Sequence, residues 1–99
     1  MTQSLQARSI EEIDIRKEVN EFPGHVFWAT KIRRRIVDRY DLALDQRQEH
    51  SLGTKIGEVL SIMFSNGEIY VYSRGGSHHA IKYARKQVRQ IAELNNYFE

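Results

Sequence analysis

The sequence contains no cysteine, a single proline (Pro23) and no long apolar run. Without cysteine there are no disulfides and no thiolate metal ligands, so we expect a protein of a reducing compartment. No stretch approaches the roughly 18 apolar residues that cross a bilayer, and the first residues lack the pattern of a secretory signal. The length of 99 residues is that of a single domain. We therefore predict one cytoplasmic domain, spanning residues 1–99, that does not enter a membrane.

An excess of one charge is also lacking, because 15 basic residues are nearly balanced by 13 acidic ones. The basic residues are nevertheless clustered in the middle of the chain, at Lys31, Arg33, Arg34, Arg35 and Arg39. Such a basic cluster is typical of a surface that contacts phosphates. It is also typical of a solvated helix face, because Asp38 and Asp41 interrupt it. The sequence leaves both interpretations open.

The N-terminal part of the chain predicts a helix and then a strand. Ser9 and Glu12 have the spacing of a capping box, which predicts a helix over about residues 10–20. Phe22-Pro23-Gly24 should end this helix, since proline and glycine both interrupt helices. The aromatic and β-branched residues 25–28 favour a strand.

The middle of the chain predicts a second helix, a loop and a β-hairpin. Apolar residues at helical spacing indicate a helix over about 30–44, and the mostly polar residues 46–54 indicate a loop. Two apolar runs then flank Asn66-Gly67, a pair that tolerates the positive φ angles of a tight turn. We therefore predict an antiparallel hairpin over residues 58–73.

The C-terminal part of the chain predicts a long amphipathic helix. Ser77 follows two glycines and has the side chain of a helix N-cap. The apolar residues at helical spacing are Ile81, Ala84, Val88, Ile91 and Leu94. The opposite, basic stripe consists of Lys82, Arg85, Lys86 and Arg89. The predicted fold is thus α+β, a hairpin-centred antiparallel sheet backed by helices.

The length of the hairpin turn decides which side chains share a sheet face. A two-residue loop sets Phe64 opposite Ile69, whereas a bulged three-residue loop sets Ile62 opposite Tyr70. Periodicity does not choose between these registers. In either register one face stays uncovered by the C-terminal helix, so the helix 30–44 or a partner must cover it.

Several of these segments resemble one repeat of the TATA-box-binding proteins. The resemblance rests on Phe22-Pro23-Gly24, Phe64-Ser65-Asn66-Gly67, the run Ile69 to Tyr72, and Ala84-Arg85-Lys86 with Arg89. It is clearest over residues 64–94, about a third of the chain. The resemblance implies a curved antiparallel sheet backed by helices, whose concave face lies in the DNA minor groove.

Carried over by position, the resemblance assigns roles to individual residues. Phe22 and Phe64 would wedge between base steps, and the groove-facing floor would be Leu60, Ile62, Tyr70 and Tyr72. This arrangement requires the bulged three-residue turn. Because the chain holds a single repeat, a complete saddle needs two chains, which implies a homodimer.

The titratable residues provide no convincing catalytic or metal site. His78 and His79 are adjacent, so on a helix they point about 100° apart and chelate one metal poorly. We therefore expect no enzyme activity, cofactor or metal. The leading hypothesis is a DNA-binding, transcription-related module that uses the sheet face, the basic cluster 31–39 with Arg33, Arg34 and Arg35, or both. The alternative is a protein–protein interaction domain that binds through the sheet face or the basic stripe and contacts no nucleic acid.

Overall fold

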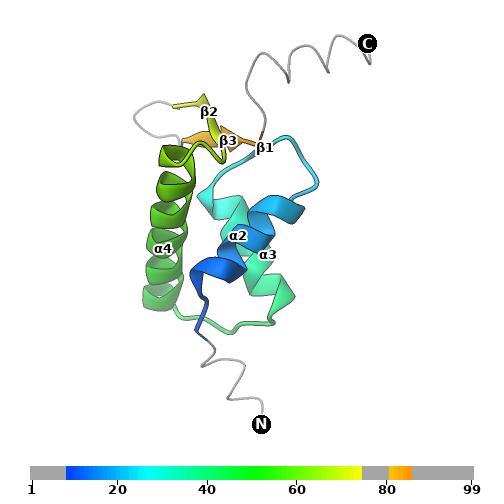
Figure 1. Ribbon diagram of the computed structural model, residues 1–99. Helices are drawn as coiled ribbons and strands as arrows, with labels where there is room; N and C mark the ends of the chain where they lie inside the picture. Colours follow the sequence, from blue (N-terminus) through cyan, green and yellow to red (C-terminus); the bar gives the residue numbers. More distant parts are fainter. Residues whose placement is uncertain (1–8, 75–80, 86–99) are drawn as a thin grey trace.

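The computed structural model describes residues 9–74 and 81–85, and in this part of the chain three helices pack beside a small sheet (Figure 1). The elements are α2 (Glu12–Glu21), β1 (Val26–Phe27), α3 (Ala29–Arg39), α4 (Gln46–Ser65), β2 (Tyr70–Ser73) and β3 (Lys82–Ala84). The strands are antiparallel in the order β1-β3-β2, and the sheet lies across one end of the helices. The predicted α+β class with an antiparallel sheet is confirmed.

Helix α2 and strand β1 occupy the places that the sequence predicts. The capping pair lies two residues later than expected, because the Glu11 backbone N–H donates to Asp14 Oδ2 over 2.8 Å. The helix ends before Pro23, and Phe22, the residue before this proline, is extended. The ring of Phe22 lies 5.8 Å from that of Phe27 in β1 and is only 8% exposed. Phe22 is therefore a core residue that joins α2 to the sheet.

Helix α3 begins as predicted but ends five residues early. Its buried residues, Ile32 and Ile36, face α2 and α4, and the helix gives way to a turn at Tyr40. Asp41 in this turn has a φ of 50°. The Leu42 N–H then donates to the Val37 carbonyl over 3.0 Å, and Leu42 is buried. A local hydrogen-bonded turn thus replaces the last part of the predicted helix.

Helix α4 corrects the largest error of the sequence prediction. Residues expected to form a loop (46–54) and the first arm of the hairpin (58–65) form one helix of 20 residues. Asp45 caps it, because Gln48 N–H donates to Asp45 Oδ1 over 2.8 Å and Asp45 N–H donates to Gln48 Oε1 over 2.9 Å. The buried stripe of α4 consists of Leu52, Ile56, Val59, Leu60 and Met63.

The Asn66-Gly67 pair ends helix α4 instead of turning a hairpin. Gly67 N–H donates to the Phe64 carbonyl over 3.0 Å, and Glu68 N–H donates to the Met63 carbonyl over 2.8 Å. These two bonds, with Gly67 at a φ of 77°, form a Schellman motif. Both predicted turn lengths for the 58–73 hairpin are therefore wrong, although its second arm is a strand.

Strand β2 pairs with β3, which the sequence assigned to the start of the C-terminal helix. Val71 lies opposite Tyr83, and Tyr83 lies opposite Phe27 on its other side, so β3 is the central strand. The helix predicted from Ile81 onward is therefore wrong over 81–85. The rest of that prediction, including the Ser77 cap, lies outside the described residues.

One hydrophobic core connects the helices with the sheet. Its fully buried large side chains include Ile15, Phe27, Ile32, Ile36, Ile56, Leu60, Met63 and Ile69. Tyr83 links the layers, since its ring lies 6.4 Å from Phe27 and 6.5 Å from Phe64. The sequence offers the helix 30–44 as a cover for one face of the hairpin. Helix α3 instead packs on both α2 and α4.

Candidate nucleic-acid interface

The predicted basic cluster is divided between two arginines that pair with a buried carboxylate and residues that do not. Arg35 Nε lies 3.1 Å from Glu18 Oε1, and the guanidinium of Arg39 contacts the other oxygen of the same carboxylate. Glu18 on α2 is fully buried, so these two arginines compensate a charge that would otherwise be costly to bury. Hydrogen bonding to Glu18 raises the pKa of Arg39 above its ordinary value. Arg35 and Arg39 thus join α3 to α2.

Arg33 and Arg34 differ from the two arginines that pair with Glu18. Arg34 is exposed and forms no ion pair with any of the described residues. Arg33 is half-buried, and its Nη1 would lie 3.5 Å from a Cβ atom placed on Gly53 of α4. Arg33 therefore lies along the contact between α3 and α4, whereas Arg34 remains available to a partner.

The aromatic and aliphatic residues assigned to a DNA-binding sheet face do not share a face. Leu60 is fully buried in α4, where a sheet floor was predicted. Ile62 and Phe64 are on the same helix and are 45% and 40% exposed. Tyr70 and Tyr72 lie on β2, half-buried and exposed respectively. Because residues 58–65 are helical, the predicted groove-facing floor is wrong. The predicted pair of wedges is wrong as well, because Phe22 is buried in the core whereas Phe64 is exposed on α4.

The basic stripe predicted on the C-terminal helix is also rearranged where the structure describes it. Lys82 begins strand β3, and Arg85 follows that strand. The Arg85 guanidinium donates to the carbonyls of Val19, Asn20 and Gly24 at 3.1, 2.7 and 3.1 Å. Arg85 therefore fastens β3 to the C-terminal end of α2. Lys86 and Arg89 lie outside the described residues.

The outward face of α4 is a surface that the sequence analysis missed. It runs opposite the buried stripe and carries exposed polar or charged side chains, at Arg47, His50, Ser51, Thr54, Glu58, Ser61 and Ser65. Apart from His50, which adjoins them, these residues follow one another at intervals of three or four, which places them on one side of the helix. The apolar spacing of Leu52, Ile56 and Met63 and the Asp45–Gln48 capping pair were the signals that could have revealed this face.

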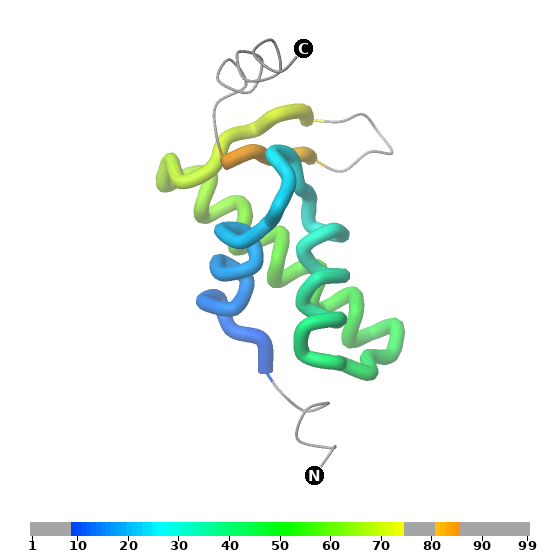
Figure 2. Tube along the Cα trace, turned by 90° about the vertical axis from the view of Figure 1, so that its right-hand side faces the viewer, coloured from blue at the N-terminus to red at the C-terminus, as the bar shows by residue number. Residues whose placement is uncertain are grey.

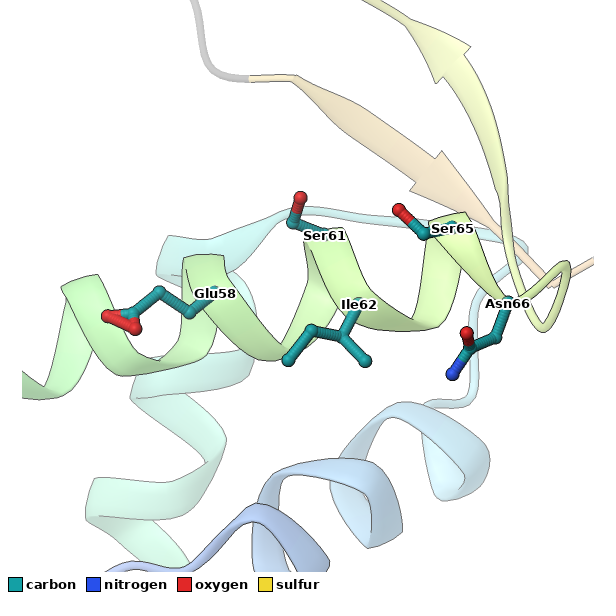
Figure 3. Close-up of a pocket in the computed structure, with 5 residues that line it drawn as sticks. All are labelled: Glu58, Ser61, Ile62, Ser65 and Asn66. Atoms are coloured by element: carbon teal, nitrogen blue, oxygen red, sulfur yellow. The ribbon is translucent and has the colours of Figure 1, made fainter.

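Toward its C-terminal end, α4 borders a shallow depression lined by Glu58, Ser61, Ile62, Ser65 and Asn66 (Figure 3). Figure 3 shows Ser61 and Ser65 on one side of the helix and Ile62 on the other. The depression is open and draws its walls from one helix and the residue that follows it. It offers hydroxyl groups and one carboxylate for contact with a partner rather than an enclosed pocket for a small substrate.

Comparison of the chain with protein families, characterised proteins and solved structures finds no match. The resemblance to a TATA-box-binding repeat consequently remains a prediction. Among residues 9–74 and 81–85, no three histidine or acidic side chains are placed to hold a metal ion. Within the same ranges, every helix is too short or too polar to cross a membrane. The candidate interface thus rests on the geometry of α3, α4 and the sheet.

Proposed function

We propose that this domain binds double-stranded DNA through α4, with α3 and α4 acting as a helix-turn-helix unit. The two helices are consecutive, pack on each other and are joined by the short turn over residues 40–45. In such units the first helix supports the second, and the second helix lies in the major groove. Here α3 contributes buried Ile32 and Ile36 to the core while α4 keeps a long face exposed.

The order of the remaining elements supports the same assignment. The described chain runs helix, strand, helix, helix, strand, strand, which is the order of winged helix-turn-helix domains. Figure 2 shows the beginning of α3 beneath the start of β3, with the N-terminal half of α4 lower on the same side. A duplex lying along α4 would therefore also meet the end of β2 and the beginning of β3.

The observation that carries the proposal is the chemistry of the outward face of α4. Ser51, Thr54 and Ser61 are short donors and acceptors, so they let the helix approach base edges closely. Arg47 on α4 and Arg34 on α3 supply positive charge for phosphates. This surface replaces the minor-groove wedge implied by the sequence resemblance, because Phe22 is in the core.

The proposal is tested with Thr54→Glu, which adds a second negative charge to the outward face, four residues before Glu58. The matched control is Asn20→Glu, which adds the same charge on the exposed side of α2. Fluorescence anisotropy with a duplex of about 20 base pairs measures affinity. We expect Thr54→Glu to weaken binding by roughly tenfold or more, equivalent to about 1.4 kcal/mol, and Asn20→Glu to bind like the parent. Equal affinity of the two variants would reject α4 as the DNA-contacting helix.

Protein–protein interaction is the second candidate function, and two exposed isoleucines favour it. Ile13 on α2 is 74% exposed and Ile62 on α4 is 45% exposed. We propose that a second copy of the chain covers these side chains, since helix-turn-helix proteins commonly bind paired half-sites as dimers. Salt separates the two functions, because phosphate contacts weaken steeply with added salt and an apolar interface does not.

A further inference from the structure

The side chain of Trp28 lies close to two lysines from different elements. Trp28 directly follows β1 and precedes α3, and its indole is half-buried. Lys31 Nζ on α3 lies 5.1 Å from the centroid of the indole, and Lys82 Nζ on β3 lies 5.2 Å from it. The pairing of Phe27 with Tyr83 places Trp28 across from Lys82, so the register of the sheet creates this contact. We call Trp28, Lys31 and Lys82 the Trp28 cluster.

Within residues 9–74 and 81–85, no acidic side chain neutralises the two lysines of the Trp28 cluster. Among the described residues neither ammonium group forms an ion pair, and the first turn of α3 contains no acidic residue. Two ammonium groups beside one ring repel each other, and the positive end of the α3 dipole adds to the same field. The cluster is therefore a local excess of positive charge with an aromatic floor.

We propose that the Trp28 cluster binds one phosphodiester group of the DNA backbone, an inference that rests on the proposed function. A phosphate beside the indole gains charge-assisted hydrogen bonds from the lysine ammonium groups and offsets their positive charge, and Lys is a common phosphate ligand. The cluster joins the start of α3 to the start of β3. A phosphate held there would fix the register of the duplex along α4 and would not read its sequence.

The test compares Lys31→Gln and Lys82→Gln with Lys17→Gln, which removes the same charge from the exposed side of α2. Anisotropy of a labelled duplex of about 20 base pairs is measured over a salt series. Each cluster variant should flatten the slope of log affinity against log salt by about 0.9, and Lys17→Gln should leave it unchanged. Lys82→Arg should keep the parental slope, because it retains the charge.

A second readout comes from the indole itself, because Trp28 is the single tryptophan of the chain. Adding the duplex should change its emission in the parent and in Lys17→Gln, and the change should be smaller in Lys31→Gln and Lys82→Gln. Far-ultraviolet circular dichroism confirms that each variant is folded. A parent that binds duplex with unchanged emission, together with cluster variants of parental salt slope, would overturn the Trp28 cluster and leave the proposed function intact.

If the parent does not bind the duplex, the proposed function is rejected. The assignment of the Trp28 cluster to the DNA backbone is then rejected as well. Titration with inorganic phosphate then separates the sources of the anion. An emission change that depends on Lys31 and Lys82 would assign the cluster to a free anion and overturn its role on the DNA backbone. No change with either probe would overturn anion binding altogether.

Discussion

Asp41 is the one described residue other than glycine with a positive φ, 50°, and it lies in the turn between α3 and α4. A Cβ atom makes this left-handed conformation costly, although the short polar side chain of aspartate tolerates it better than most. We expect Asp41→Ala to lower the free energy of unfolding by about 1 kcal/mol and Asp41→Gly to leave it equal or higher. Urea unfolding measures both values, and a glycine variant less stable than the alanine variant would contradict the strain.

The Glu18 ion pairs give a second prediction at single residues. Removing both arginines in Arg35→Gln/Arg39→Gln leaves the Glu18 carboxylate buried without compensation. We expect the free energy of unfolding to fall by about 3 kcal/mol, whereas Arg34→Gln should change it by less than about 0.5 kcal/mol. Thermal unfolding provides the comparison. Equal stability of the two proteins would mean that Arg35 and Arg39 do not support the fold.

The difference between these arginines could not be predicted from the sequence. Arg33, Arg34 and Arg35 are consecutive, and their partners depend on which side of α3 faces α2. Glu18, the residue that engages Arg35, is 17 positions earlier in the chain. Charge clustering therefore located the basic segment but not the direction in which each side chain points.

Glycine has opposite effects at the interior and at the end of α4, and this difference gives a matched pair of variants. Gly67 has a φ of 77° in the Schellman motif, so Gly67→Ala should destabilise the protein by about 1 kcal/mol. Gly57 lies within the helix, and a Cβ atom there meets no atom within 4 Å. Gly57→Ala should therefore stabilise by about 0.5–1 kcal/mol. Melting temperatures that shift in the same direction for both variants would rule out this description of the helix end.

The elements that the sequence predicted well are those with unambiguous local signals. Pro23 ends α2, and Val26 and Phe27 after it form β1. Helix α4 was missed because its C-terminal half contains three β-branched residues and Phe64 and is followed by Asn66-Gly67. That pair suits both a hairpin turn and a helix end, and only burial against α2 and α3 decides between them. The outward face of α4 was missed for the same reason.

At the scale of the whole molecule, the exposed Ile13 and Ile62 predict the oligomeric state. If a second copy covers them, light scattering at micromolar concentration should give twice the chain mass of 11.7 kDa. Ile13→Ser/Ile62→Ser should then give the mass of a single chain, because the variant removes apolar area from the interface. Ile81→Ser, at a similarly apolar and exposed position before β3, is the matched control and should remain dimeric. A monomeric parent would exclude the homodimer.

The central position of β3 also determines how the chain assembles. Strands β1 and β2 pair with β3 and not with each other, so neither is hydrogen-bonded into the sheet until Lys82–Ala84 is in place. Val26 must wait for Ala84, which is a distant pairing along the chain and one that forms slowly. As the chain leaves the ribosome, its helices can therefore collapse while both edge strands still expose unpaired backbone. A chain truncated before Lys82 should lose the entire sheet rather than one strand, and the unpaired backbone of residues 26–27 and 70–73 would be open to aggregation.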